Sequence, residues 1–229
     1  MRIPIAKYGL PQVVIYPGLC VLLMALSILT AFLSIGLFCF LEFILALILI
    51  WMLSFFRDPL RVIPVGDDLI LSPADGTITD VEVVDEPNVI DGPATRIGIF
   101  LSVFNVHINR TPCAVKIENI TYKKGAFINA MDANCGKLNE SNDLSMIRLI
   151  EPRDKILVRQ ISGAIARRIV CDAEKGQEFA GGVIFGMIKF GSRTELYLPA
   201  QSTAKILVKK GDKVRAGLTI LAKYDRTNK

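Results

Sequence analysis

Three residues of this sequence have side chains that could do chemistry, and each lies beside an apolar run. Ser192 follows Gly191 in KFGSRTELYLP, between two apolar runs. His107, the single histidine of the chain, stands in FLSVFNVHINRTP, and Asp75 lies in LSPADGTI. These residues could supply a nucleophilic hydroxyl, a proton carrier for neutral pH, and a carboxylate that orients a base or accepts a proton.

Each of these residues also has a purely structural interpretation. Gly191-Ser192 and Asp75-Gly76 could be turns, although a tight hairpin favours Asn-Gly or Asp-Gly because both central residues need positive φ. A lone histidine is often structural, but His107 stands between an apolar run and a polar stretch, which favours a strand end that opens into a cleft. A single histidine excludes zinc sites that need several.

The elements that must position these residues are short β-type runs separated by turns. The predicted strands are 69–71, 76–84, 95–102, 115–122, 145–150, 156–161, 164–170, 182–190, 193–198, 204–209 and 218–223. This pattern predicts a mainly β fold, an antiparallel sandwich or partly closed barrel. The part ILVKKGDKVRAGLTILAKY is lipoyl-like, but Lys213 lacks the hairpin-tip setting of a modified carrier lysine. The one long irregular stretch, 125–143, has the length of a functional loop.

An apolar segment, residues 13–56, precedes the β-type runs, and Glu42 is its only acidic or basic residue. The segment divides near Ser34-Ile35-Gly36 into halves that are each long enough to span a bilayer. Glu42 would be costly in lipid unless it is paired or reaches the interface. We therefore expect an N-terminal membrane anchor, residues 1–56, and a catalytic β-rich domain, residues 57–229.

Basic residues on both sides of the apolar segment predict the membrane topology of the anchor. Arg2 and Lys7 precede the apolar segment, and Arg57 and Arg61 follow it. Positive flanks favour the cytoplasmic side, so we expect a helical hairpin in the cell (inner) membrane with the catalytic domain on the cytoplasmic face. A hairpin in one leaflet and a buried helical pair of a soluble protein are the alternatives.

The net charge indicates which partners the protein can bind, and the cysteines indicate its redox compartment. The net charge of +5 is spread over isolated basic pairs without interleaved aromatics, which predicts no nucleic-acid partner and is compatible with anionic lipid. The five cysteines form no CxxC pair, which indicates a reducing compartment without disulfides or a zinc site. A homo-oligomer is compatible with these patterns.

Five motifs together resemble one enzyme family. In order, FFRDPLRVIP, LSPADGTI, FLSVFNVHINRTP, a loop with GAF and NESN, and KFGSRTELYLP resemble the phosphatidylserine decarboxylases, from Phe55 onward. The length and apolar N-terminus resemble the short bacterial form. The resemblance implies a lyase of phospholipid biosynthesis that converts phosphatidylserine in the membrane to phosphatidylethanolamine.

The resemblance also implies a proenzyme that cuts itself at Gly191-Ser192. Ser192 would attack the Gly191 carbonyl, and elimination and hydrolysis would leave a pyruvoyl group at residue 192. The large chain, 1–191, and the small chain, 192–229, would stay associated. The pyruvoyl ketone would form a Schiff base with the substrate amine and act as the electron sink, so neither pyridoxal phosphate nor a metal is expected.

Site roles follow from the same resemblance. Ser192, His107 and Asp75 are the expected catalytic residues, with His107 as the acid that protonates the substrate carbon. The expected substrate-binding residues are Arg110, Asn139 and Glu140.

One position departs from the family pattern. Many members carry a second histidine where this chain has Arg110, and arginine is a poor general base. Either His107 serves both self-cleavage and turnover, or Asp75 activates Ser192, directly or through water. A guanidinium suits a phosphate or carboxylate, so we expect Arg110 to bind the anionic substrate.

Two other functions compete with the decarboxylase. A membrane-anchored Ser/Lys protease of the leader-peptidase type would need a serine–lysine pair and a catalytic domain outside the cytoplasm, against the flanking charges. A carrier-like or adaptor barrel would have no catalytic function. Only the decarboxylase predicts a break before residue 192.

Overall fold

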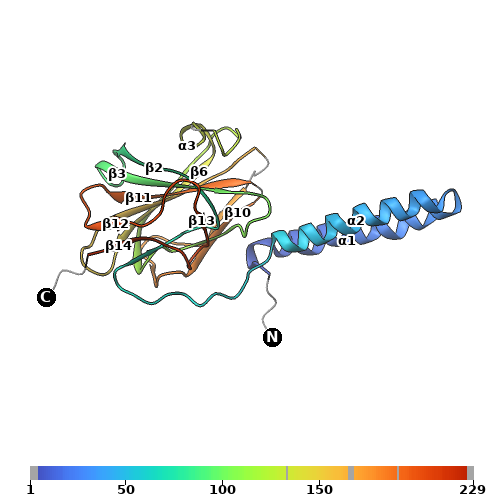
Figure 1. Ribbon diagram of the computed structural model, residues 1–229, viewed down its shortest axis with the longest axis horizontal. Coiled ribbons are helices and arrows are strands. Elements are labelled where there is room, and N and C mark those ends of the chain that lie inside the picture. The colour runs from blue at the N-terminus through green and yellow to red at the C-terminus, as the bar shows by residue number, and fades with distance from the viewer. Residues whose placement is uncertain (1–4, 133, 165–167, 190, 226–229) are drawn as a thin grey trace. The chain divides into compact units, whose positions relative to one another are not determined.

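The chain forms two compact units, residues 1–60 and 61–229. The computed structural model describes residues 5–132, 134–164, 168–189 and 191–225. The first unit is helical, and the second consists mainly of strands (Figure 1). The mainly β fold with a preceding helical hairpin is therefore confirmed.

The helical unit consists of α1 (Leu10–Ser27) and α2 (Ile35–Phe55), with the short 3-10 helices η1 (Lys7–Gly9) and η2 (Ile28–Phe32). The chain reverses before Ser34, whose side chain accepts a hydrogen bond from the Leu37 amide as an N-cap. The two segments from residue 12 to 32 and from 35 to 55 are each long and apolar enough to cross a membrane. Most of their large apolar side chains are exposed, as lipid-facing residues would be.

Glu42 is paired within this hairpin. Its carboxylate accepts a 2.5 Å hydrogen bond from the Ser27 hydroxyl, and the Ser27 hydroxyl also lies 2.8 Å from the Met24 carbonyl. The acidic side chain that would be costly in lipid thus has a partner on the other helix.

The second unit contains fourteen strands and one short helix among its described residues. They are β1 (Leu69–Leu71), β2 (Gly76–Glu86), β3 (Gly92–Leu101), β4 (Ile108–Arg110), β5 (Val115–Lys123), α3 (Cys135–Leu138), β6 (Ser141–Arg148), β7 (Lys155–Ile161), β8 (Arg168–Cys171), β9 (Glu178–Phe179), β10 (Ile184–Lys189), β11 (Ser192–Pro199), β12 (Ala204–Ile206), β13 (Lys213–Val214) and β14 (Ile220–Tyr224). The stretch predicted to be irregular, 125–143, therefore contains α3 and the start of β6.

These strands form three antiparallel sheets. The largest has the order β13-β2-β3-β11-β7-β6-β5-β9, and the others are β1-β14-β12 and β4-β10-β8. Figure 1 shows β2, β3 and β11 side by side, with β12 and β14 beneath them in that view. The largest sheet ends at β13 and β9, so it is open within the described part of the chain.

The core lies between the sheets. One cluster of buried apolar side chains joins Ile99 of β3 and Leu196 of β11 to Phe185 of β10 and Leu221 of β14, so all three sheets contribute to it. Successive side chains of a strand point to opposite faces, so Ser192, Thr194 and Leu196 of β11 share the core face. The next residues along, Arg193 and Glu195, point to the other face.

Candidate active site

The Gly191-Ser192 pair lies where the chain passes from one sheet to another. β10 belongs to the β4-β10-β8 sheet, whereas β11 begins at Ser192 in the largest sheet. Gly191 has φ of 59°, a left-handed conformation that glycine adopts without steric cost. Ser192 pairs with Leu101 of β3. The predicted strands on either side of this pair are therefore present, and they belong to two different sheets.

Strand pairing brings His107 to this crossing. β4, which starts just after His107, pairs antiparallel with β10, and the Ile188 amide donates to the His107 carbonyl at 3.2 Å. On the ring, Nδ1 lies 3.0 Å from the Asn105 carbonyl, and Nε2 accepts from the Gly191 amide at 3.3 Å.

These two contacts assign the tautomer of His107. A carbonyl oxygen only accepts hydrogen bonds, so Nδ1 carries the proton toward Asn105. Nε2 then presents its lone pair to Gly191, which an N–H donor requires. The ring is fully buried, and its basic nitrogen faces the backbone of the Gly-Ser pair.

The Ser192 hydroxyl is buried without a hydrogen bond. The residue is fully buried, and its Oγ has no partner among the described residues. Leaving a buried hydroxyl unpaired costs about 1–3 kcal/mol, so native proteins seldom do so without a reason. The serine–lysine hydrogen bond that a Ser/Lys protease would need at Ser192 is thus not formed in the described chain.

A buried amide chain lies beside Ser192 on the same face. Asn109 donates to the Thr194 hydroxyl at 3.1 Å and accepts from Gln160 at 2.9 Å, and Gln160 in turn accepts from Asn142 at 3.0 Å. All four side chains are nearly or fully buried. These side-chain hydrogen bonds connect β4, which follows His107, to β11, β7 and β6. They therefore fix the position of His107 relative to β11, the strand that begins with Ser192.

Asp75 lies in an ion pair. Its carboxylate accepts hydrogen bonds from Nη1 and Nη2 of Arg61, at 2.6 and 2.8 Å, and from the Ala216 amide at 2.8 Å. None of its hydrogen bonds within the described chain goes to His107 or Ser192. The preceding turn does reach the site, because the Pro73 carbonyl accepts from the Asn109 side chain.

Arg110 is buried and points away from bulk solvent. Its Nη1 donates to the Gly182 carbonyl at 2.9 Å. A Cβ added at Gly217 would lie 3.0 Å from the Arg110 Cδ, so Gly217 leaves room for the side chain. Contact with a substrate anion stays a prediction.

Asn139 and Glu140 hold the long loop beside the site. The Asn139 amide donates to the Ile128 and Ser162 carbonyls at 2.9 and 2.7 Å and accepts from the Ile128 amide at 2.9 Å. The Glu140 carbonyl accepts from the Ser162 amide and hydroxyl. Asn139 and Glu140 thus both hold Ser162, the neighbour of Gly163. Contact of Asn139 and Glu140 with the substrate stays a prediction.

Gly163 and Arg61 are site residues that the sequence reasoning missed. A Cβ at Gly163 would lie 2.3 Å from the Gly191 carbonyl oxygen, so only glycine lets the chain pass there. Arg61 stands in the FFRDPLRVIP motif, so the sequence did mark this segment as one of the family motifs. The motif alone did not reveal that Arg61 forms an ion pair with Asp75. Within the described residues, no group of three or more His, Cys, Asp or Glu side chains could hold a metal ion.

Comparison with known proteins relates this site to one family. The family model described as phosphatidylserine decarboxylase matches residues 48–222. A phosphatidylserine decarboxylase proenzyme of Carboxydothermus hydrogenoformans is 42% identical over 177 residues, which cover 77% of this chain and 81% of that protein. The matched span includes the Gly-Ser crossing, the histidine and the Arg61–Asp75 pair.

Proposed function

The chain belongs to the phosphatidylserine decarboxylase family, and from this premise we propose that it matures by cutting its own backbone at Gly191-Ser192. Its reaction is the decarboxylation of phosphatidylserine to phosphatidylethanolamine, a lyase reaction of phospholipid biosynthesis. The cofactor would be a pyruvoyl group made from Ser192.

The unpaired Ser192 hydroxyl is the observation that carries this proposal. A structural serine at a strand end would bond its hydroxyl to a carbonyl or to solvent, but this one is buried and has no partner within the part of the chain that the structure describes. The adjacent Gly191 is held in a left-handed conformation, and the lone pair of His107 Nε2 faces its amide. The proposed base thus contacts the residue that carries the scissile carbonyl, and the proposed nucleophile is the next residue along the chain.

Self-cleavage would use the chain's own groups. With His107 taking its proton, Ser192 Oγ forms a bond to the Gly191 carbonyl carbon. The bond from that carbon to the Ser192 nitrogen breaks, and His107 returns the proton to the nitrogen, which becomes a free amine. The Ser192 Cα then gives a proton to His107, and Gly191 departs as a carboxylate that keeps the serine oxygen. Water hydrolyses the resulting dehydroalanine and releases ammonia, which leaves the pyruvoyl group on the small chain.

The surroundings of residue 192 fit such a group. The buried Oγ has no hydrogen-bond partner among the described residues, and β11 holds the residue between β3 and β7. When present, a pyruvoyl ketone supplies the electron sink for loss of carbon dioxide. We assign to His107 the delivery of a proton to the substrate carbon, because its Nε2 lies 3.3 Å from the amide of Gly191, the residue before this position, and can donate once it is protonated.

The remaining site residues have supporting roles in this proposal. Asp75, held by Arg61, would position the turn that contacts Asn109 and would assist cleavage. Arg110, Asn139 and Glu140 would bind the anionic headgroup or hold the loop that does so.

The anchor would place this reaction at a bilayer. Two apolar helices of membrane-spanning length precede the catalytic unit, and positive residues flank them on both sides. We propose that the catalytic unit faces the cytoplasm at the inner membrane, and that the large and small chains stay together there as partners.

Intact mass measurement of the purified full-length protein tests the proposal. We expect two chains, residues 1–191 and 192–229, with the small chain beginning in a pyruvoyl group that blocks Edman sequencing. Ser192→Ala should remain one chain, whereas Ser141→Ala, which changes another buried strand serine, should be cut like the wild type. A fully active wild-type protein that stays in one piece would overturn the proposal.

A further inference from the structure

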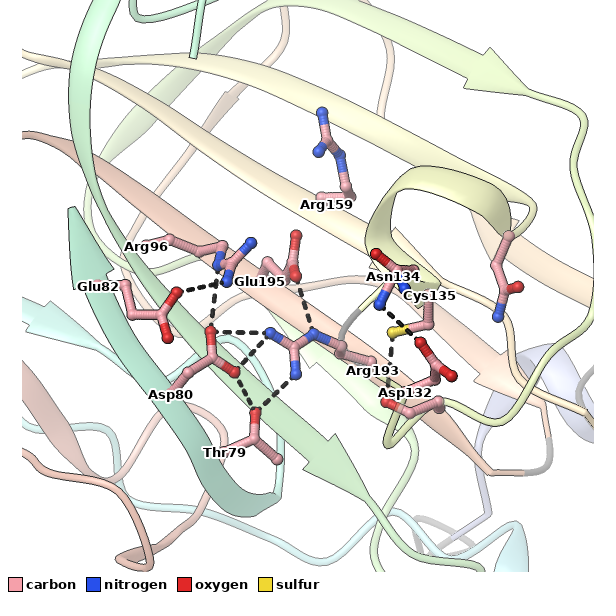
Figure 2. Close-up of polar contacts among 12 residues, drawn as sticks. Thr79, Asp80, Glu82, Arg96, Asp132, Asn134, Cys135, Arg159, Arg193 and Glu195 are labelled. Carbon is pink, nitrogen blue, oxygen red and sulfur yellow. Dashed lines mark hydrogen bonds and ion pairs between the residues drawn. The ribbon is translucent and has the colours of Figure 1, made fainter. Parts of the chain in front are cut away.

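Arg193, the residue after the proposed break, is enclosed by hydrogen-bond acceptors on the outer face of the largest sheet. Its guanidinium donates to the Thr79 hydroxyl at 2.6 Å and to both Asp80 oxygens at 3.0 and 2.7 Å. Its Nε donates to Glu195 at 2.8 Å. Figure 2 shows the guanidinium between Thr79 and Asp80 of β2 on one side and Glu195 of β11 on the other.

Two features of the backbone make this arrangement possible. Consecutive strand residues normally point to opposite faces, but the pairing of β2 with β3 shifts register between Ile78 and Asp80. This irregularity lets both Thr79 and Asp80 reach one guanidinium. On β3, a Cβ at Gly98 would lie 2.1 Å from Arg193 Nη2, so the glycine leaves the space that the guanidinium fills.

The contacts extend from Arg193 to a third strand. Glu195 accepts from the Tyr197 hydroxyl at 2.6 Å, and Arg159 of β7 donates to that hydroxyl at 3.1 Å. Arg193 and Glu195 are 5% and 1% exposed, so the charges are paired away from water. Burial would raise the pKa of Asp80, but the Thr79 hydrogen bond and the charge of Arg193 lower it overall.

Cleavage would change what holds the start of β11. In the uncut chain, Gly191 fixes Ser192 covalently. After the cut, residue 192 would be held by its bond to Arg193 and, among the described residues, by its strand pairing with Leu101, because the pairing of β11 with β7 begins at Arg193 and Ile161. Strand ends fray when their contacts are few, and decarboxylation needs the new terminal residue in one place.

We propose that Arg193 is a positioning residue that holds the first residues of the small chain in register after the backbone is cut. This inference rests on the proposed self-cleavage. Arg193 and the reacting residue lie on opposite faces of β11, so Arg193 acts through the backbone without touching substrate. Thr79 and Asp80 belong to the large chain, so their bonds join the two products of the cut within two residues of the new terminus.

Hydrogen exchange measured by mass spectrometry on the full-length protein separates this role from general stabilisation. Arg193→Met is compared with wild type in two forms, the processed enzyme and the uncut protein that carries Ser192→Ala. Arg193→Met removes all four hydrogen bonds of the guanidinium, so we expect amides 193–196 to exchange at least about 10- to 100-fold faster in the processed variant, the factor for loss of a single charge-assisted hydrogen bond. In the uncut form, where the covalent bond to Gly191 also holds residue 192, the same substitution should accelerate exchange by a clearly smaller factor than in the processed form.

Turnover supplies a second readout. The kcat of processed Arg193→Met for phosphatidylserine should fall while KM stays near the wild-type value. The reason is that Arg193 and its partners lie on the face of β11 away from the reacting residue. Arg193→Lys keeps the charge but lacks the planar fork, so we expect intermediate exchange and an intermediate kcat.

Arg96 provides the matched control. It also donates to Asp80, at 3.1 Å, and to Glu82, which both lie in β2, so its hydrogen bonds among the described residues join segments of the large chain, and only the charge of Glu195 acts on it from the small chain. Arg96→Met should affect exchange equally in the cut and uncut forms.

Three outcomes would decide the question. Equal acceleration in both forms of Arg193→Met would overturn the positioning role and leave self-cleavage standing. A wild-type protein that is not cut would instead overturn the proposed function. If Arg193→Met does not accumulate, Thr79→Val removes one acceptor of the same guanidinium, and absence of any difference between its two forms would count equally against the inference.

Discussion

Replacing Asp75 by asparagine would remove the charge that faces Arg61. The two side chains are 10% and 5% exposed and form a bidentate ion pair, and Asp75 also accepts from the Ala216 amide. Asparagine keeps the shape and one acceptor, but it leaves the Arg61 guanidinium buried without a counter-charge. Breaking a buried pair in this way costs about 3–5 kcal/mol.

This cost is large compared with the stability of a domain of this size. The free energy of unfolding of a domain is about 5–15 kcal/mol. For a protein of 150–250 residues, a loss of about 1 kcal/mol lowers the midpoint temperature of thermal unfolding by about 2–4 °C. We therefore expect Asp75→Asn to lower the unfolding temperature of the purified protein by roughly 6–20 °C. The control is Asp143→Asn, which breaks the more exposed bidentate pair with Arg159 and should have a smaller effect.

The same series tests whether Asp75 takes part in cleavage. Replacing both partners, as Arg61→Met with Asp75→Asn, removes the unpaired charge and should restore most of the stability. If the carboxylate assists cleavage, this double variant should be stable yet remain uncut on a denaturing gel. A double variant that is cut at the wild-type rate would refute a role for Asp75 beyond stability. An Asp75→Asn protein as stable as the wild type would refute the energetic argument itself.

Three further predictions concern the site and the cluster beside it. His107→Ala should lower carbon dioxide release by roughly 10²–10⁴ and slow cleavage on a gel, and a fully cut, fully active variant would make the histidine structural. Gly163→Ala should slow cleavage because its Cβ would lie 2.3 Å from the Gly191 carbonyl oxygen, whereas Gly181→Ala, whose Cβ would lie no closer than 3.3 Å to a neighbour, should be cut normally. The pKa of Asp80 is lowered from its ordinary value of 3.8, so its ion pairs stabilise the fold above that value and are lost as the pH falls through the folded-state pKa. Thermal melts should thus show a steeper loss of stability below about pH 4 for wild type than for Asp80→Asn, and equal slopes would contradict this.

The fold was largely predictable because its main signals are local. A long apolar run with one acidic residue indicates a pair of membrane-length helices, and alternating apolar residues between turns indicate strands. The sequence did not reveal β4, because Ile108 is its one apolar residue and two polar residues follow it. That strand pairs with β10 and thereby places His107 beside Gly191.

The contacts of the site were less predictable because they depend on register and on residues far apart. The LSPADGTI motif indicated Asp75, but only the folded chain shows that Arg61 pairs with it. Likewise, Arg193 stood in a quoted motif, and its bond to Asp80 depends on a register shift that no local pattern specifies. The roles of Ser192 and His107 were drawn from a resemblance, and the structure adds their geometry.

The position of β11 within the largest sheet has a consequence for refolding. The proposed small chain contributes β11 between β3 and β7, and it also supplies β12, β13 and β14, which pair with one another or with β1 and β2. Before the cut, all these strands assemble within one molecule, where the chain itself keeps their concentration high. After the cut, the same assembly would require two separate chains to meet and to insert a central strand, a slow bimolecular step during which exposed strand edges can aggregate. If the proposed cut occurs, the uncut chain would be the form that folds, and the mature enzyme would persist through its slow unfolding, since once denatured it would have no equally direct way back.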